Sequence, residues 1–163
     1  MRNSPARPPP RCPLDDRRAI AHAVARDEIR QLLARYNHAG DRGRLDELVA
    51  CFAEDGVMEL PDLPALRGRA AIRAHLEGVV AGLAAATTRA TLRHHVASVW
   101  IELDPDATDR ARSRAYFSVF TEIGLDHWGA YRDELRRDDG GWRFSWRTVR
   151  VDGAVADSRM VKA

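Results

Sequence analysis

The sequence has almost no lysine, little cysteine and no long apolar run. Lys162 is the one lysine among its 26 basic residues, which we interpret as GC-rich codon usage and a bacterial source. Cys12 lies in an arginine- and proline-rich stretch and Cys51 in an apolar segment, so we expect no structural disulfide and a cytoplasmic location. No run approaches the roughly 18 apolar residues of a membrane span, so we expect no membrane association.

Motifs that bind nucleotides and metals are missing as well. There is no GxGxxG or P-loop pattern, and the six histidines occur without HxH, HExxH or CxxC spacing. We therefore expect no cofactor and no metal. The net charge of +2 comes from the N-terminus, because without residues 1–14 the chain has 23 basic residues against 24 acidic ones. A near-neutral domain does not predict a nucleic-acid surface.

The N-terminal stretch differs in composition from the rest. Residues 1–14 hold three arginines and five prolines, and no apolar segment follows that would make them a secretory signal. We predict that they form a disordered tail, since they cannot bury enough apolar surface to become ordered. The folded domain is predicted over residues 15–152, with a second tail over 153–163. A chain of 163 residues is long enough for one domain with a substantial core.

Hydrophobic periodicity changes near residue 90. The first part has helical spacing, as in Ile29, Leu32, Leu33 and Tyr36. It predicts helices over about 15–39, 45–52 and 69–84, with a turn at Glu54-Asp55-Gly56 and a short strand over 57–60. The second part predicts strands over 91–103, 110–123, 127–137 and 142–152. Helices followed by a meander predict an α+β fold, a cone-shaped curved mixed β-sheet with three N-terminal helices enclosing a pocket.

Two short stretches carry residues suited to acid–base chemistry. Tyr36 and Asp41 lie at the end of the first helix, and His94-His95 begins the first long strand. A carboxylate that orients an imidazole, with a phenol that donates to a carbonyl oxygen, can move protons next to a ketone. Asp41 could instead cap the following helix. The adjacent histidines point to opposite faces of a strand, and alternation does not decide between them because both faces are apolar.

Several ordered motifs resemble the SnoaL-like branch of the nuclear-transport-factor-two-like superfamily. They are Arg35-Tyr36 with Asp41, Leu45-Asp46-Glu47-Leu48, Phe52-Ala53-Glu54-Asp55-Gly56, Gly68-Arg69-Ala70-Ala71-Ile72, His95-Val96, and Tyr131 to Trp142. Within this superfamily, the chain most resembles in its candidate catalytic residues the dehydratases that act on scytalone and bile acids. That resemblance implies Tyr36, Asp41 and His95 as the catalytic group and Arg150 as a substrate contact. A second pocket tyrosine is replaced by Glu59, and His127 is interpreted as an ordinary strand histidine.

The resulting hypothesis is a cofactor-independent lyase or isomerase. It would act through an enolate on a small hydrophobic oxygenated molecule, such as a polyketide or a sterol-like ketone, by dehydration, isomerisation or cyclisation. His95 would take the proton, Asp41 would orient it and Tyr36 would donate to the oxyanion, while Trp128 and Tyr131 would line the pocket. Two alternatives remain open. One is a cyclase that works by shape alone. The other is a non-catalytic ligand-binding or subunit-contact module, like the beta subunits of ring-hydroxylating dioxygenases. The sheet face predicts a homodimer or homotrimer.

Overall fold

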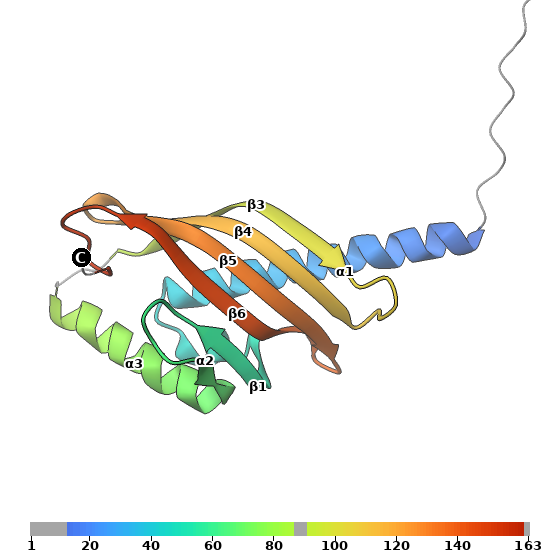
Figure 1. Ribbon diagram of the computed structural model, residues 1–163, viewed down its shortest axis with the longest axis horizontal. Coiled ribbons are helices and arrows are strands. Elements are labelled where there is room, and N and C mark those ends of the chain that lie inside the picture. The colour runs from blue at the N-terminus through green and yellow to red at the C-terminus, as the bar shows by residue number, and fades with distance from the viewer. Residues whose placement is uncertain (1–12, 87–90, 162–163) are drawn as a thin grey trace, which may run out of the picture.

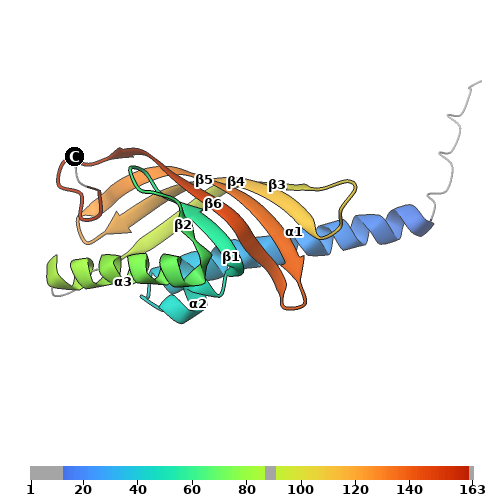
Figure 2. The ribbon, with the colours of Figure 1, turned by 60° about the horizontal axis from the view of Figure 1, so that its bottom comes forward.

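The computed structural model describes residues 13–86 and 91–161, with side chains for 16–84 and 91–161. Figures 1 and 2 show the helices packed under one face of a long curved sheet. The elements are α1 (Pro13–Gly40), α2 (Leu45–Val49), β1 (Phe52–Glu59), β2 (Leu66–Arg67), α3 (Gly68–Ala86), β3 (Arg93–Leu103), β4 (Arg110–Thr121), β5 (Gly124–Asp138) and β6 (Gly141–Ala154).

The six strands form one unclosed sheet in the order β2-β1-β6-β5-β4-β3. Strands β3 to β6 form an antiparallel meander, and β1 pairs in parallel with β6. This arrangement confirms the predicted α+β class with a curved mixed sheet and three helices. The meander turns sharply at Asp138-Asp139-Gly140-Gly141, where Gly141 has a φ of 101° that favours glycine.

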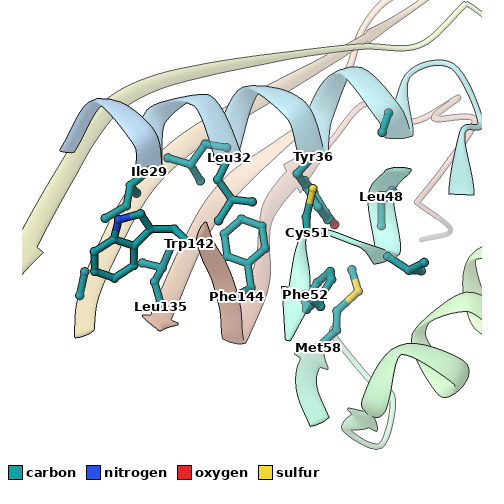
Figure 3. Close-up of a cluster of buried hydrophobic side chains, with 14 of the residues drawn as sticks. Ile29, Leu32, Tyr36, Leu48, Cys51, Phe52, Met58, Leu135, Trp142 and Phe144 are labelled. Atoms are coloured by element: carbon teal, nitrogen blue, oxygen red, sulfur yellow. The ribbon is translucent and has the colours of Figure 1, made fainter. Parts of the chain in front are cut away.

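The main core lies between α1 and the narrow part of the sheet. The predicted stripe is buried: Ile29, Leu32, Leu33 and Tyr36 are each at most 7% exposed. In Figure 3, Ile29 lies next to Trp142, and Tyr36 points from α1 toward the sheet beside Cys51. The Tyr36 ring meets those of Phe52 and Phe144 edge-on, with centroids 6.0 and 5.6 Å apart. This packing fixes the C-terminal end of α1 against the sheet.

The segment after α2 differs from the sequence prediction. The short helix ends at Val49 rather than continuing to Phe52, and Glu54-Asp55-Gly56 is part of β1 rather than a turn before it. The register between β1 and β6 shifts between Phe52 and Val57, so the turn residues form an irregularity inside a strand. A Cβ at Gly56 would lie 2.9 Å from the carbonyl oxygens of Ala53 and Phe144, which only a glycine avoids.

The two predicted tails have different outcomes. Residues 1–12 of the predicted N-terminal tail lie outside the described residues. At the other end, β6 continues to Ala154, and residues 155–161 fold back onto the sheet instead of leaving it. No helix in the described ranges is long and apolar enough to span a lipid bilayer.

Candidate acid–base site

A cavity of about 550 Å³ lies between the helices and the inner face of the sheet. Its wall is mostly apolar, with side chains from α3 and from the strands, among them Leu76, Val79, Leu83, Phe117, Val149 and Val151. Helix α1 contributes Tyr36 and Asn37. The polar groups are few and include His94, His127 and Tyr131. This volume and composition are typical of sites for small organic molecules.

His94, which lines this cavity, is hydrogen-bonded to Asp41, which does not line it. Nδ1 of His94 lies 2.6 Å from Oδ1 of Asp41, and the backbone N–H of His94 donates to both carboxylate oxygens at 3.2 Å. The side chains are 16% and 7% exposed. Because the carboxylate receives the Nδ1 proton, Nε2 is left as the nitrogen available to a ligand. Asp41 lines a separate hollow of about 290 Å³ between α1 and β3.

The prediction that His95 is the partner of Asp41 is wrong. His95 is exposed on the outer face, where its ring lies 4.9 Å from that of Phe120. The reason is a bulge in β3: the register with β4 shifts between Ala97 and Trp100, and Ser98 has a φ of 52°. Because β3 has one more residue than β4 at this point, the side chains after the bulge alternate in the opposite phase between the inner and outer faces. The inner face therefore carries His94 and Val96 before the bulge but Val99 and Ile101 after it, a mixture that strict alternation cannot reveal.

A second histidine–aspartate pair lies on the same inner face, and sequence reasoning missed it. Nδ1 of His127 is 2.7 Å from Oδ1 of Asp126, and the two side chains are 8% and 0% exposed. Neighbours in a regular strand face opposite ways, but the β4–β5 register shifts between Val119 and Phe120, opposite Asp126. His94 pairs with Val119 and Val119 with His127, so the histidines lie two strands apart in one row. At normal strand spacing their Cα atoms are roughly 10 Å apart.

Tyr36 and Tyr131 both line the cavity. From the sequence, Tyr36 is expected as a catalytic residue and Tyr131 as part of the pocket wall. The Tyr131 hydroxyl donates to Oδ1 of Asn37 at 3.3 Å, and the Asn37 amide donates to the Leu33 carbonyl at 2.8 Å. Burial raises the pKa of both Tyr36 and Tyr131. Both phenols therefore stay protonated at neutral pH and can donate a hydrogen bond.

A buried ion pair supports these tyrosines from the side away from the cavity. The guanidinium of Arg147 binds Asp133 through Nε–Oδ1 at 2.7 Å and Nη2–Oδ2 at 3.0 Å, and neither side chain is exposed. Its Cζ lies 4.2 Å from the ring centroids of both Tyr36 and Tyr131. Arg147 has its pKa raised: burial acts against the charge, but Asp133 outweighs it. No sequence signal distinguished this arginine from the surface ones.

The other two predicted contacts lie elsewhere. Trp128 is 39% exposed on the outer face, and its ring covers the backbone of Gly153. Arg150 is exposed, pairs with Asp152 at 2.7 Å and lines a neighbouring hollow of about 420 Å³ beside β6. Neither lines the 550 Å³ cavity, so these two placements are wrong. The alternation of β5 and β6 places Tyr131 and Val149 inward, which puts Trp128 and Arg150 outward.

Residues 13–86 and 91–161, the described part of the chain, contain no cluster of three or more histidine, cysteine, aspartate or glutamate side chains suited to a metal ion. His75 also lines the cavity, beside apolar side chains of α3. The chemistry that the described residues offer is therefore proton transfer by two imidazoles and hydrogen bonding by two phenols.

Comparisons with known proteins agree with this fold. The model for the SnoaL-like domain matches residues 14–148. A solved NTF2-like protein with a cystatin-like fold from Novosphingobium aromaticivorans is 26% identical, covering 93% of this chain and 98% of its own, with a TM-score of 0.75. The protein Rv3472 from Mycobacterium tuberculosis, whose function is unknown, is 27% identical over 92% of this chain and 82% of its own, with a TM-score of 0.70.

A third similar structure, again from Novosphingobium aromaticivorans, is provisionally named a scytalone dehydratase. It is 23% identical over 89% of this chain and 94% of its own, with a TM-score of 0.73, and supports the fold alone. No curated protein matches the chain.

Proposed function

This chain belongs to the SnoaL-like domain family, and from that premise we propose that it is an acid–base lyase or isomerase for a small hydrophobic ketone. The observation that carries the proposal is that two histidines, each hydrogen-bonded to an aspartate, line one mostly apolar cavity. Two imidazoles facing a space of this size are suited to taking a proton from one atom of a ligand and giving it to another.

In the proposed reaction, Nε2 of His94 removes a proton from the carbon next to a carbonyl group. The C–H electron pair moves into an enolate, and Asp41 stabilises the imidazolium that forms. Tyr36 donates a hydrogen bond to the enolate oxygen, which an apolar surrounding strengthens, while the Tyr131 hydroxyl donates to Asn37. Reprotonation at another carbon gives isomerisation, and attack of the enolate on a second carbonyl gives cyclisation.

Dehydration needs one further proton. When the ligand carries a hydroxyl group beta to the carbonyl, the enolate expels it, and the C–O bond breaks as a C=C bond forms. A protonated imidazole must then deliver a proton so that water leaves. Protonated His94 can do this, and so can protonated His127, since both line the cavity. The Phe117 ring lies near both imidazoles, with its centroid 6.5 Å from that of His94 and 5.9 Å from that of His127.

The test uses deuterium exchange, which does not require the natural substrate. The flat bicyclic ketone 2-tetralone is incubated with the protein in D2O, and NMR follows loss of the signal of the protons next to the carbonyl. We expect the protein to accelerate exchange and His94→Gln to reduce the acceleration by about 10²–10⁴-fold, the usual contribution of a positioned base. Asp41→Asn is expected to reduce it as well, and the double variant should lose little more because the pair acts as a unit.

His95→Gln is the matched control, because it changes the adjacent histidine on the opposite face. It should keep wild-type exchange. Equal activity of folded His94→Gln and wild type would refute the assignment. A protein that binds a panel of aromatic and alicyclic ketones without exchanging their protons would instead be a binding module.

A further inference from the structure

The segment after β6 returns to the cavity. We call residues Val155–Val161 the C-terminal strap. The backbone N–H of Val155 donates to the carbonyl of Asp126 at 2.9 Å, and Met160 and Val161 line the cavity. Met160 also packs against the buried cluster of Phe117, Val119 and Tyr131. Figure 1 shows the chain turning back at the tip of the sheet, near its C-terminal end. The strap therefore forms part of the cavity wall.

One buried carboxylate, that of Asp126, holds the strap in place. Oδ1 of Asp126 accepts the Ser158 hydroxyl at 2.7 Å, and Oδ2 accepts the backbone N–H of Arg159, also at 2.7 Å. Oδ1 is at the same time the partner of Nδ1 of His127. The Ser158 oxygen in turn accepts the N–H groups of Met160 and Val161 at 3.2 and 2.9 Å, which shapes the turn that enters the cavity.

The one ion pair that the strap forms among the described residues is peripheral. Arg159 forms an ion pair with Glu122 at 3.1 Å, with the side chains 44% and 33% exposed. Exposed pairs of this kind contribute little. The bonds to Asp126 are partly buried and charge-assisted, and charge-assisted bonds are roughly twice as strong as neutral ones. The strap is therefore held mainly by the residue that also orients His127.

We propose that the strap is the gate of the cavity, and that Ser158 is a positioning residue that acts on His127 through Asp126. When the strap is closed, three donors fix the Asp126 carboxylate, and the carboxylate fixes the imidazole with Nδ1–H toward it and Nε2 available to the ligand. When the strap opens to admit a ligand, Asp126 loses two donors and gains water, so the imidazole is free to change tautomer. Closure of the strap therefore also fixes the tautomer and the orientation of the His127 imidazole. This holds whether or not the cavity performs chemistry.

Two measurements test the proposal on the full-length chain. The first is the rate at which prodan, a flat fluorescent naphthyl ketone, enters the cavity in a stopped-flow experiment. The second is the tautomer of His127 from the ring ¹⁵N chemical shifts at pH 8, with the signal assigned by its absence in His127→Gln. Ser158→Ala should raise the entry rate about tenfold to a hundredfold, the effect of losing one hydrogen bond to a charged group. It should also change His127 from a single Nδ1–H tautomer to a mixture.

Asp157→Ala is the matched control, since Asp157 is exposed in the same strap next to Ser158. It should change neither measurement. Faster entry in Ser158→Ala with an unchanged His127 tautomer would overturn the coupling. Unchanged entry would overturn the gate. Equal effects of Asp157→Ala and Ser158→Ala would also overturn it, because they would indicate general loosening. Thermal melts of each variant check that the fold is intact.

Discussion

Removing one member of the Asp133–Arg147 pair should lower the free energy of unfolding by about 3–5 kcal/mol, whereas removing both should change it little. Asp133→Leu leaves a guanidinium that no solvent reaches and that already has Nη1 without a hydrogen-bond partner among the described residues. It also frees the Ser113 hydroxyl, which donates to Asp133 at 2.7 Å. Arg147→Met likewise leaves a buried carboxylate.

The magnitude follows from the burial of both groups. Breaking a fully buried pair by removing one partner costs about 3–5 kcal/mol. The three rings around Arg147, with Phe144 at 3.9 Å, do not supply a counter-charge. Against a total stability of about 5–15 kcal/mol, such a loss is a large fraction of the whole. The double variant Asp133→Leu/Arg147→Met removes both charges and fills the site with apolar atoms, so its stability should lie close to that of the wild type.

Urea denaturation followed by tryptophan fluorescence measures these differences as a double-mutant cycle. With a slope of about 2 kcal/mol/M, each single variant should lower the midpoint by roughly 2 M. The double variant should then recover most of that loss. Single variants that cost less than about 1 kcal/mol, or effects that simply add in the double variant, would refute the view that the charges stabilise one another across a dry interior.

Three further outcomes are expected. Gly129→Ala should lower the melting temperature, since its Cβ would lie 1.9 Å from the Arg150 carbonyl oxygen. Gly78→Ala in α3 has open space around it and should raise the melting temperature slightly. Equal melting temperatures of the two variants would contradict this. Burial alone would raise the pKa of Asp126, but the Ser158 hydroxyl, the Arg159 N–H and His127 together lower it. The ionised carboxylate therefore stabilises the closed strap at neutral pH. This stabilisation is lost as the pH falls through the lowered pKa, below about 4. Prodan entry should therefore quicken in acid before far-UV circular dichroism changes, and a constant rate would contradict this. We also propose that copies of the chain associate through the outer face as a homodimer or homotrimer, because that face exposes aromatic side chains beside alternating charges of both signs, including Trp100, Tyr116, Phe120, Trp128, Glu102 and Arg114. Sedimentation should give a multiple of 18.2 kDa that Trp100→Glu reduces, and a monomer at micromolar concentration would argue against it.

The fold was predictable because its signals are local and repeated. The stripe at Ile29 and Leu32 and the glycine-rich turn before Trp142 each depend on a few neighbouring residues, and the structure has them as predicted. Most of the site was not predictable in this way. Asp41 and Tyr36 were found because they lie on one helix end. The histidine that pairs with Asp41 was not identified, because the bulge at Ser98 has no glycine to mark it.

The other missed residues have the same physical origin. His127 and Asp126 share a surface because a register shift lies opposite them, and a regular strand would separate them. Asp133 and Arg147 look like surface charges in a sequence where arginine is abundant. Only the pairing of β5 with β6, which brings Asp133 opposite Arg147, shows that they neutralise one another inside the molecule.

The place of β6 in the sheet has a consequence for how the chain folds as it is synthesised. This strand, the last one described, lies between β1 and β5, so the early and late parts of the sheet cannot join until it has left the ribosome. Until then β1 and β5 each have an open edge, and exposed edges invite pairing with other chains. Contacts between segments about 90 residues apart, such as Phe52 with Phe144, also make folding slow. Nascent-chain pulling or pulse-labelling experiments should therefore place the main folding step after β6 emerges, and chaperone demand should be highest just before it.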